Sequence, residues 1–518
     1  MADIVLTTLN AKYAHAAFGL RYLMANLGSL RDRAVLVEFD INQRSIDVLE
    51  RLLAHNPRII GLGVYIWNVR AATELVGLIK RVRPDVTVIL GGPEVSYETN
   101  SQRICELADY VICGEADLAF AELCSAILEG RSPGQEIIHA GLPEFSQVAL
   151  PYEFYTPDDI AQRILYVEAS RGCPFSCEFC LSSLDIPVRQ APLDAFLASM
   201  DRLIQRGARQ LKFVDRTFNL DARVSSAILE FLLQRYEPGM FFHFEMVPDR
   251  LPESLRAVIR RFLPGALQFE VGIQSFNPEV GGLIHRRQDY PKLEENLRFL
   301  REQTGIHIHA DLIVGLPGET LPSFASGFDR LVALRPHEIQ VGILKKLRGT
   351  PISRHDEPWQ MIYSPEPPYE ILQNRLIDFA TMQRLRRFAR YWDLVGNSGN
   401  FRLTLPLLWQ IPNLPPASPF DSFLKWSNWL YQQTGRTDSI ALPRLAEWWF
   451  TYLTDHCGLA PAEVAASLWK DYSAPGGKDV PGFLTPYVTR PTPQPRPSRA
   501  PDGRARGIPK RQGRHLAG

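Results

Sequence analysis

Short apolar runs alternate with amphipathic stretches over the first 350 residues of the chain. Runs such as IIGLGVYI (59–66) are apolar throughout, as strands buried on both faces of a parallel sheet are. Stretches such as AATELVGLIKRVR (71–83) have the spacing of helices that bury one face. A chain that repeats strand and helix in this order builds parallel sheets covered by helices. We therefore expect an α/β protein.

The first sheet is expected within residues 1–150, as an open, doubly wound sheet of Rossmann type. We predict its strands at residues 3–9, 34–40, 58–66, 86–91 and 109–113. Ligands of such sheets bind beyond the carboxyl ends of the strands, and no GxGxxG signature for a dinucleotide follows these strands. Tyr65 and Trp67 could instead be core aromatics. The residues that we expect to contact a cofactor there are Asn10, Tyr65, Trp67, Asn68, Gly91, Gly92, Pro93, Glu94, Gly114 and Glu115.

A second set of strands is expected within residues 160–350, as a partial (β/α)6 barrel. We predict these strands at residues 164–169, 209–214, 240–246, 267–273, 306–314 and 338–344. Amphipathic helices separate them along the chain. Active sites of barrels gather at the carboxyl ends of the strands, so polar residues at those ends are candidate ligands.

Three cysteines follow the first strand of this second set, in the segment RGCPFSCEFC (171–180). Cys173, Cys177 and Cys180 have no fourth cysteine close by in the sequence. A structural zinc site needs four ligands and disulfides need pairs. A [4Fe–4S] cluster held at three irons leaves the fourth iron open for an exchangeable ligand. We predict that these cysteines hold such a cluster and are catalytic; the alternative is a zinc site completed by a distant histidine.

The spacing CxxxCxxC, with the aromatic Phe179 before the last cysteine, resembles the signature of the radical S-adenosylmethionine (SAM) superfamily. The resemblance implies that SAM chelates the open iron through its amino and carboxylate groups. Glu270 could instead pair with Arg286 or Arg287. The residues that the resemblance places around SAM are Asp215, Glu245, Glu270, Gln274, Gly315 and Pro317.

The motifs NAKYAH (10–15), YIWNV (65–69), GGPEVS (91–96) and GEAD (114–117) precede the cysteines in this order. Together they resemble the cobalamin-binding domain found ahead of many radical SAM domains. The chain lacks the aspartate two positions before His15 that would complete the histidine-ligand signature. The resemblance therefore implies cobalamin without a protein histidine on cobalt. The alternative is a degenerate Rossmann-like module that only packs against its neighbour.

The last third of the chain changes character. Eight of the nine tryptophans lie beyond residue 350, and we expect a mainly helical domain at residues 351–480. The segment MQRLRRFARYWDL (382–394) carries four arginines that could contact an anionic substrate, although a solvated helix face is the alternative. Residues 486–518 are basic and rich in proline, and we expect them to be disordered.

The composition points to a reducing cytoplasm. The chain has seven cysteines, of which three form one cluster, and this usage fits cytoplasmic proteins better than a disulfide framework. We expect no signal peptide, and the longest apolar runs are too short for a membrane span.

As a whole, the layout resembles bacterial cobalamin-binding radical SAM enzymes with an uncharacterised C-terminal domain. This implies methyl transfer to an unactivated carbon of an unknown small-molecule or peptide substrate, through a 5′-deoxyadenosyl radical, with an electron donor such as flavodoxin or ferredoxin. One alternative is a cobalamin-dependent rearrangement or cyclisation without methyl transfer. Another is a nucleic-acid-binding or modification factor that uses the basic tail, although a solvated extension is the simpler interpretation of that tail.

Overall fold

The computed structural model describes residues 2–131, 133–185, 187–411, 415–473, 480–488 and 508–516. These residues pack as two compact units. The first unit consists of Met1–Phe218, Lys345–Ser353 and Tyr363–Glu370, and the second of Asn219–Leu344, Arg354–Ile362 and Ile371–Gly518. The domain limits expected from the sequence stay predictions.

The first unit contains an all-parallel sheet with the strand order β2-β1-β3-β4-β5-β6. Its first five strands confirm the five predicted from the apolar runs. The sixth has three residues and is too short to leave a pattern in the sequence. The strands are β1 (Ile4–Asn10), β2 (Ala34–Asp40), β3 (Ile59–Gly63), β4 (Thr87–Gly91), β5 (Tyr110–Cys113) and β6 (Ile137–His139).

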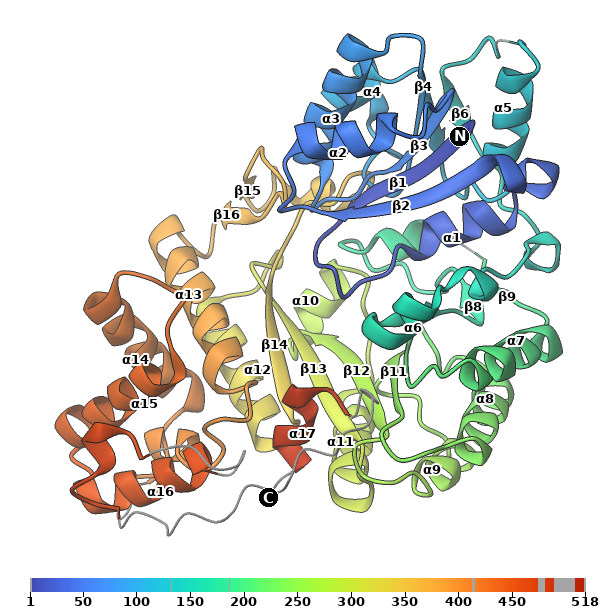
Figure 1. Cartoon of the computed structure of the whole chain (residues 1–518). Helices are drawn as coiled ribbons and strands as arrows, with labels where there is room; N and C mark the ends of the chain where they lie inside the picture. Colours follow the sequence, from blue (N-terminus) through green and yellow to red (C-terminus); the bar gives the residue numbers. More distant parts are fainter. Residues whose placement is uncertain are drawn as a thin grey trace. The chain divides into compact units, whose positions relative to one another are not determined.

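Helices cover both faces of this sheet (Figure 1). The core on one face includes α2 (Ser45–Leu53), α3 (Val69–Val82) and α4 (Arg103–Leu107). The core on the other face includes α1 (Phe18–Ala25) and α5 (Ala119–Leu128). The strand order reverses at β1, which has β2 on one side and β3 on the other. Ligands of doubly wound sheets bind in the crevice at this reversal.

The cysteine segment also belongs to the first unit and lies between two short strands. β8 (Ser170–Arg171) pairs antiparallel with β9 (Arg189–Gln190), so the loop between them is closed by backbone hydrogen bonds. Next to it in the sequence, β7 (Leu165–Val167) pairs in parallel with β10 (Gln210–Phe213). The helices of this region are α6 (Pro157–Gln162) and α7 (Leu193–Gln205).

The second unit contains four parallel strands in the order β14-β13-β12-β11. Together with β7 and β10 of the first unit, they confirm the six strands predicted between residues 164 and 344. The elements of this region are α8 (Ala222–Gln234), β11 (Phe241–Met246), α9 (Glu253–Ile259), β12 (Leu267–Gln274), α10 (Pro278–Leu283), α11 (Tyr290–Gln303), β13 (His307–Val314), α12 (Leu321–Ala333) and β14 (Glu338–Ile343).

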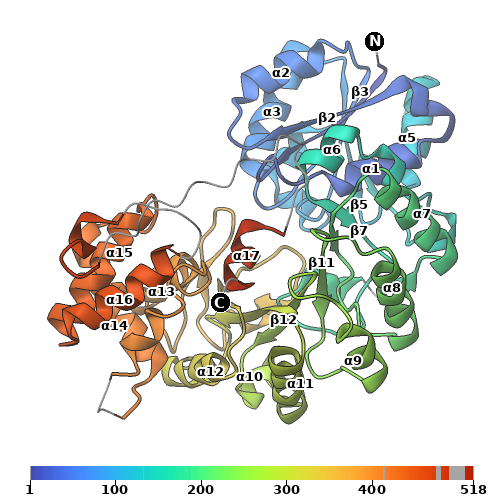
Figure 2. The same ribbon diagram turned by 60° about the horizontal axis from the view of Figure 1, so that its bottom comes forward.

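The C-terminal region of the second unit is mainly helical, as predicted (Figures 1 and 2). Its core is aromatic, because Trp426 stacks on Trp449 at 4.5 Å between ring centroids and both are fully buried. The arginines expected on the helix at 382–394 make local contacts; Arg387 lies 4.4 Å above the ring of Tyr431. Its main elements are the strand β16 (Ile371–Gln373) and the helices α13 (Phe379–Val395), α14 (Pro419–Thr434), α15 (Leu442–Thr451) and α16 (Pro461–Ser473).

The tail contains a helix, α17 (Lys510–Leu516), so the prediction of disorder is wrong for residues 508–516. Arg511 forms ion pairs with Glu338 at 3.0 Å and Asp393 at 2.6 Å, and Gln512 donates to Gln268 at 2.8 Å. These contacts hold α17 beside the amino ends of β12 and β14, and Figure 2 shows α17 next to β12. Tertiary docking therefore orders a segment whose composition predicts disorder. Residues 489–507 and 517–518 lie outside the described part of the chain.

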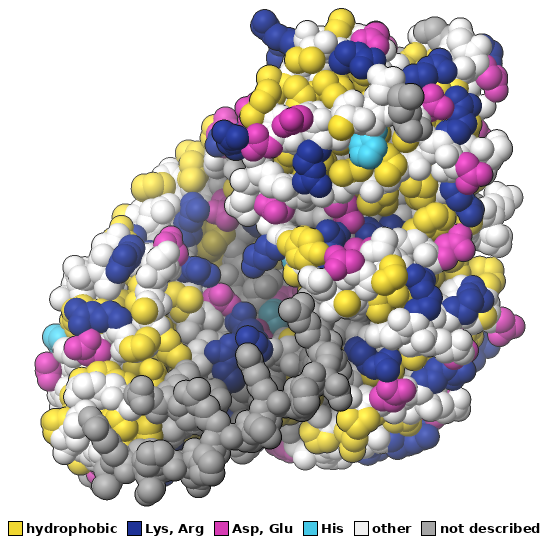
Figure 3. Space-filling model, in the orientation of Figure 1, with side chains coloured by type: hydrophobic (Ala, Val, Ile, Leu, Met, Phe, Trp, Pro, Cys, Tyr) yellow, Lys and Arg dark blue, Asp and Glu magenta, His cyan; other side chains and the backbone are white. Residues whose placement is uncertain are grey.

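Charged side chains of both signs are mixed on the face that Figure 3 shows, in keeping with the zero formal charge of the chain. Within the described ranges, no helix combines the length and the apolar character needed to cross a membrane.

Three histidine rings meet where α17 docks. The centroid of the His307 ring lies 4.7 Å from that of His337 and 5.2 Å from that of His515. Burial lowers the pKa of each, that of His337 to about 2 and that of His515 to about 4. A histidine whose pKa is lowered by docking stabilises the docked state above its free pKa of about 6.5, and this contribution is lost as pH falls.

We therefore expect α17 to dock less tightly as pH falls from about 7.5 to about 5.5, across the free histidine pKa. Hydrogen exchange of the α17 amides, corrected for the intrinsic rate, is expected to be about tenfold faster at the lower pH. That pH lies about one unit below the free histidine pKa, so protonation of one histidine favours the undocked state about tenfold. His515→Gln removes one of the titrating rings and should flatten this pH dependence. Equal protection of α17 at both pH values would contradict the expectation.

Candidate cofactor-binding site

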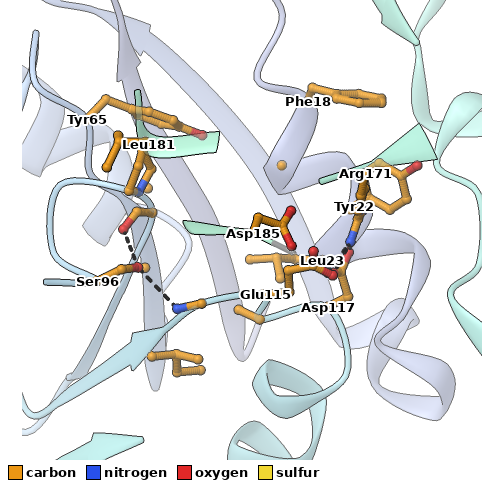
Figure 4. Close-up of a pocket in the computed structure, with 18 of the residues that line it drawn as sticks. Phe18, Tyr22, Leu23, Tyr65, Ser96, Glu115, Asp117, Arg171, Leu181 and Asp185 are labelled. Atoms are coloured by element: carbon orange, nitrogen blue, oxygen red, sulfur yellow. Dashed lines mark hydrogen bonds and ion pairs between the residues drawn. The ribbon is translucent and has the colours of Figure 1, made fainter. Parts of the chain in front are cut away.

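A cavity of about 500 Å³ lies at the carboxyl ends of β3, β4 and β5 in the first unit (Figure 4). The predicted cofactor contacts Tyr65, Gly91, Gly92, Pro93, Gly114 and Glu115 line it. The cysteine segment lines the same cavity through Gly172, Leu181 and Ser182. Lining residues that sequence reasoning did not single out include Phe18, Tyr22, Ser96, Tyr97 and Arg171.

Glycines make part of this cavity from bare backbone. Gly61 and Gly63 on β3 and Gly91 on β4 line it without side chains. Gly92 has φ +110°, and a Cβ there would lie 2.4 Å from the carbonyl oxygen of Val64. Only glycine fits this position, because other residues rarely adopt such a φ and have no space for a Cβ. The cavity is thus a cradle in which a large ring system can approach the backbone closely.

The loop after β3 is shaped by Asn68. Its fully buried amide donates to the carbonyl oxygens of Leu9 (3.1 Å) and Gly63 (3.2 Å) and accepts from the backbone N–H of Tyr65 (2.8 Å). Tyr65 in turn stacks on Trp67 at 4.5 Å. The Asn68 side chain therefore places Tyr65 at the cavity, and its own contact with a cofactor stays a prediction.

Two other predicted contacts, Glu94 and Asn10, are held by the protein itself. Glu94 is buried and accepts from Tyr369 at 2.6 Å and from Arg348 at 3.0 Å. Both partners lie on the returning segments 345–353 and 363–370 of the first unit. Asn10 donates to Glu38 at 3.0 Å. These side chains fix the loops around the cavity, and direct cofactor contact by them stays a prediction.

Ser96 ends the motif GGPEVS but is not among the cofactor contacts expected from the sequence. Its hydroxyl donates to the carbonyl oxygen of Gly92 (2.9 Å) and accepts from the backbone N–H of Gly114 (3.1 Å), as Figure 4 shows. It therefore ties the loop after β4 to the loop after β5. Its position in GGPEVS was the available signal.

The cysteine loop is sharply folded. Gly172 has φ +88°, and a Cβ there would lie 2.8 Å from the carbonyl oxygens of Asp185 and Pro187. The backbone N–H of Cys173 donates to Asp185 O at 3.0 Å, and that of Cys180 to Cys177 O at 3.1 Å. None of these three described cysteines forms a disulfide bond. Among the described residues, no three His, Cys, Asp or Glu side chains are arranged to hold a single metal ion. A cubane cluster places each thiolate on a different iron, so the three cysteines need not converge on one point to bind it.

Asp215 supports the start of this loop. Its carboxylate accepts from the backbone N–H of Ala169 at 3.1 Å and from the hydroxyl of Ser170 at 2.6 Å. Burial raises the pKa of Asp215 to about 7, although these hydrogen bonds oppose the rise. Asp215 thus anchors the residues just before the cysteines, while its neighbour Arg216 lines the cavity. Contact of Asp215 with the amino group of SAM stays a prediction.

The remaining predicted SAM contacts belong to the second unit. Glu245, Glu270 and His309 are in register on β11, β12 and β13 and so point to the same face of the sheet. Glu270 accepts from His243 at 2.8 Å. Gln274 ends β12 with a positive φ of 69°.

Beyond β13, Gly315 has φ +92°, and Pro317 is buried. A Cβ on Gly315 would lie 2.7 Å from the side chain of Ile371 on β16. The roles of these residues as SAM ligands stay predictions.

Sequence reasoning missed the charged histidine on β13. His309 lies 3.2 Å from Asp311 and 3.5 Å from Glu338. Burial opposes its charge, but the hydrogen bonds and charges of the two carboxylates raise the pKa of His309 to about 10. The sequence around His309 gives no sign of its protonation state. Its raised pKa follows from the carboxylates of Asp311 and Glu338, which only the folded structure brings close to it.

Comparison with known families matches three parts of the chain. Residues 4–124 match the B12 binding domain, residues 167–328 the Radical SAM superfamily and residues 357–488 a protein of unknown function (DUF4080). An uncharacterized methyltransferase of Pyrococcus horikoshii is 24% identical over 58% of this chain and 70% of its own length. The cobalamin-dependent radical SAM methyltransferase TokK of Streptomyces tokunonensis is 25% identical over 56% of this chain, which spans only 47% of TokK.

Among solved structures, the cobalamin-dependent SAM radical enzyme OxsB, with aqua-cobalamin and SAM bound, has a TM-score of 0.59 at 12% identity. The likeness covers 90% of this chain and 78% of OxsB. The order of domains and the motifs that match them define the class: the chain is a radical SAM enzyme with an N-terminal cobalamin-binding domain. In this chain the two domains precede the part that matches DUF4080, and its cofactors are a [4Fe–4S] cluster, SAM and cobalamin.

The cradle fits cobalamin. The Gly61, Gly63, Gly91 and Gly92 backbone would receive the ring system, and Tyr65 and Tyr97 would flank it. No histidine is found among the described residues that line the cavity.

Gly92→Ala is expected to reduce cobalamin retention at least about tenfold, because the methyl group would displace the loop that lines the cavity. Cobalt per chain after anaerobic reconstitution and desalting measures the effect. Gly130→Ala is the matched control, since Gly130 also has a positive φ (78°) but a Cβ there would meet nothing within 4 Å. Retention of cobalt by both variants would remove Gly92 from the site.

Replacing Cys173, Cys177 or Cys180 with Ala is expected to abolish reductive cleavage of SAM and to lower iron well below the content of about four per chain that one cubane cluster gives. Cys457→Ala is the control, because Cys457 lies in the helical region of the second unit. Iron analysis and the yield of 5′-deoxyadenosine test this together. A properly folded variant that still cleaves SAM would refute the assignment of the cluster ligands.

Proposed function

We propose that the protein methylates an unactivated carbon of its substrate. One observation carries this proposal: a single cavity is lined by the strand ends of the cobalamin-binding domain and by residues of the loop that holds the cluster cysteines. Two cofactor sites that share a cavity suit a reaction in which a radical formed at one site receives a group held at the other. The methyltransferase names of the Pyrococcus and Streptomyces relatives support the same reaction.

In this proposal, the residues of the chain bind the cofactors and orient them toward each other. The backbone of Gly91 and Gly92 would support the ring system, and the described lining would offer no imidazole to the bound group, because no histidine is among its described residues. The loop with Cys173, Cys177 and Cys180 leaves one iron for SAM. With both cofactors bound, the residues that line this cavity would help to exclude water from the radical.

When bound, the cluster with SAM supplies a 5′-deoxyadenosyl radical, and cobalamin supplies a methyl group. The overall balance per turnover is one substrate C–H, two SAM and two electrons in, and one C–CH3, one 5′-deoxyadenosine, one methionine and one S-adenosylhomocysteine out. The electrons require a reductant, and we propose flavodoxin or ferredoxin. The substrate class stays a small molecule or a peptide.

Product analysis separates methyl transfer from the alternative of rearrangement or cyclisation. With substrate candidates and reductant under anaerobic conditions, we expect 5′-deoxyadenosine and S-adenosylhomocysteine to form in equal amounts. CD3-labelled SAM should place a CD3 group on the product. Formation of 5′-deoxyadenosine without S-adenosylhomocysteine, from enzyme that retains cobalt, would reject methyl transfer in favour of another radical reaction.

A further inference from the structure

A buried arginine lies directly before the cysteine loop and binds three carboxylates. Arg171 reaches Glu115 at 3.0 Å, Asp117 at 2.8 Å and Glu168 at 2.7 Å (Figure 4). Glu115 and Asp117 lie on the loop after β5 of the cobalamin-binding domain, whereas Glu168 follows β7. One side chain therefore joins the loop that lines the cobalamin cavity to the segment that carries the cluster ligands.

The surroundings of Arg171 make this contact hard to replace by water. Its side chain is only 11% exposed, and its guanidinium lies 4.3 Å from the ring centroid of Tyr22 and 4.9 Å from that of Phe145. Removing one member of a buried ion pair leaves an uncompensated charge and is strongly destabilising. Lysine would keep the charge, but it cannot satisfy several carboxylates with a planar fork of donors.

A second arginine binds the same carboxylate from the other end of the loop. Arg189 on β9 reaches the carboxylates of Glu115 at 2.5 Å and of Asp185 at 2.7 Å. The backbone carbonyl oxygen of Asp185 accepts from the backbone N–H of Cys173. Arg171 and Arg189 are directly opposite in the antiparallel β8–β9 pair. Like charges in directly opposite positions destabilise a strand pair. Glu115 lies against both guanidiniums and neutralises this repulsion.

We infer that Arg171, Arg189 and Glu115 form a joint that fixes the position of the cluster relative to cobalamin. Arg171 and Arg189 are positioning residues, because they act on the cysteine loop and not on reacting atoms. Both ends of that loop are tied to one carboxylate of the cobalamin-binding domain, so the distance between the two cofactors is set by this joint. The inference rests on the presence of both cofactors and is independent of whether the reaction transfers a methyl group.

The interaction between two unpaired electrons tests the joint without a substrate. Full-length protein is loaded with both cofactors and reduced until the cluster and cob(II)alamin each carry one unpaired electron. Electron paramagnetic resonance then reports their spin–spin splitting, which depends steeply on distance and orientation. We expect a resolved splitting in the wild type and its loss into a broad line in Glu115→Gln and Arg171→Lys, in spectra compared at equal iron and cobalt contents per chain.

Controls keep the result decisive. Arg131→Met breaks an exposed pair with Glu129 in the same unit and should keep the wild-type splitting. Asp117→Asn removes one of three partners of Arg171 and serves if the stronger variants fail to fold; it should broaden the splitting. A wild-type splitting in the folded Glu115→Gln, Arg171→Lys or Asp117→Asn protein overturns the inference, as does a wild type without any splitting. Failure of methyl transfer alone would appear as missing S-adenosylhomocysteine and would leave these spectra unchanged.

Discussion

Burial of charge is the constraint on which the first unit depends. An ion taken out of water must be paired and hydrogen-bonded, and the partner must be held at the right distance. Arg21 on α1 is almost fully buried and reaches Glu38 on β2 at 2.9 Å and Asp159 on α6 at 2.7 Å. Arg163 adds a second contact to Glu38 at 2.6 Å. These buried ion pairs thus hold the segment that leads to the cysteines against the cobalamin-binding domain, because separating them inside the protein would leave charges unpaired.

The same principle operates around the cavity, where the charges belong to the site itself. Arg171 and Arg189 join the cysteine loop to Glu115, and Arg348 joins a segment far along the chain to Glu94. Glycines on β3 and β4 leave space in the cavity, while the ion pairs hold the loops around it. Rigidity of these loops suits radical chemistry, because a displacement of about 1 Å can reduce the rate about a hundredfold. Stability and function are therefore served by the same contacts in this unit.

Sequence patterns predicted what depends on local order. Apolar runs located the strands of both sheets, and the spacing of Cys173, Cys177 and Cys180 pointed to the cluster. Patterns could not distinguish a carboxylate that binds a cofactor from one that binds the protein. Glu94 has its partner Arg348 254 positions away, a distance over which no motif extends. The helix α17 was missed for a related reason: proline and arginine dominate its surroundings, and only docking against Gln268 and Glu338 orders it.

The returning segments of the first unit also constrain how the chain is made. Glu94 and Tyr97 are in place early in synthesis, but Arg348 and Gly349, which contact them, are added roughly 250 residues later. At about 5–20 residues per second, the ribosome needs tens of seconds or less to supply them. Until then the nascent cobalamin-binding domain carries a carboxylate without its arginine. Completion of the first unit therefore waits for residues 345–353, which follow the part of the chain that matches the Radical SAM superfamily. The cradle reaches its final form only after the cysteine loop has also been synthesised.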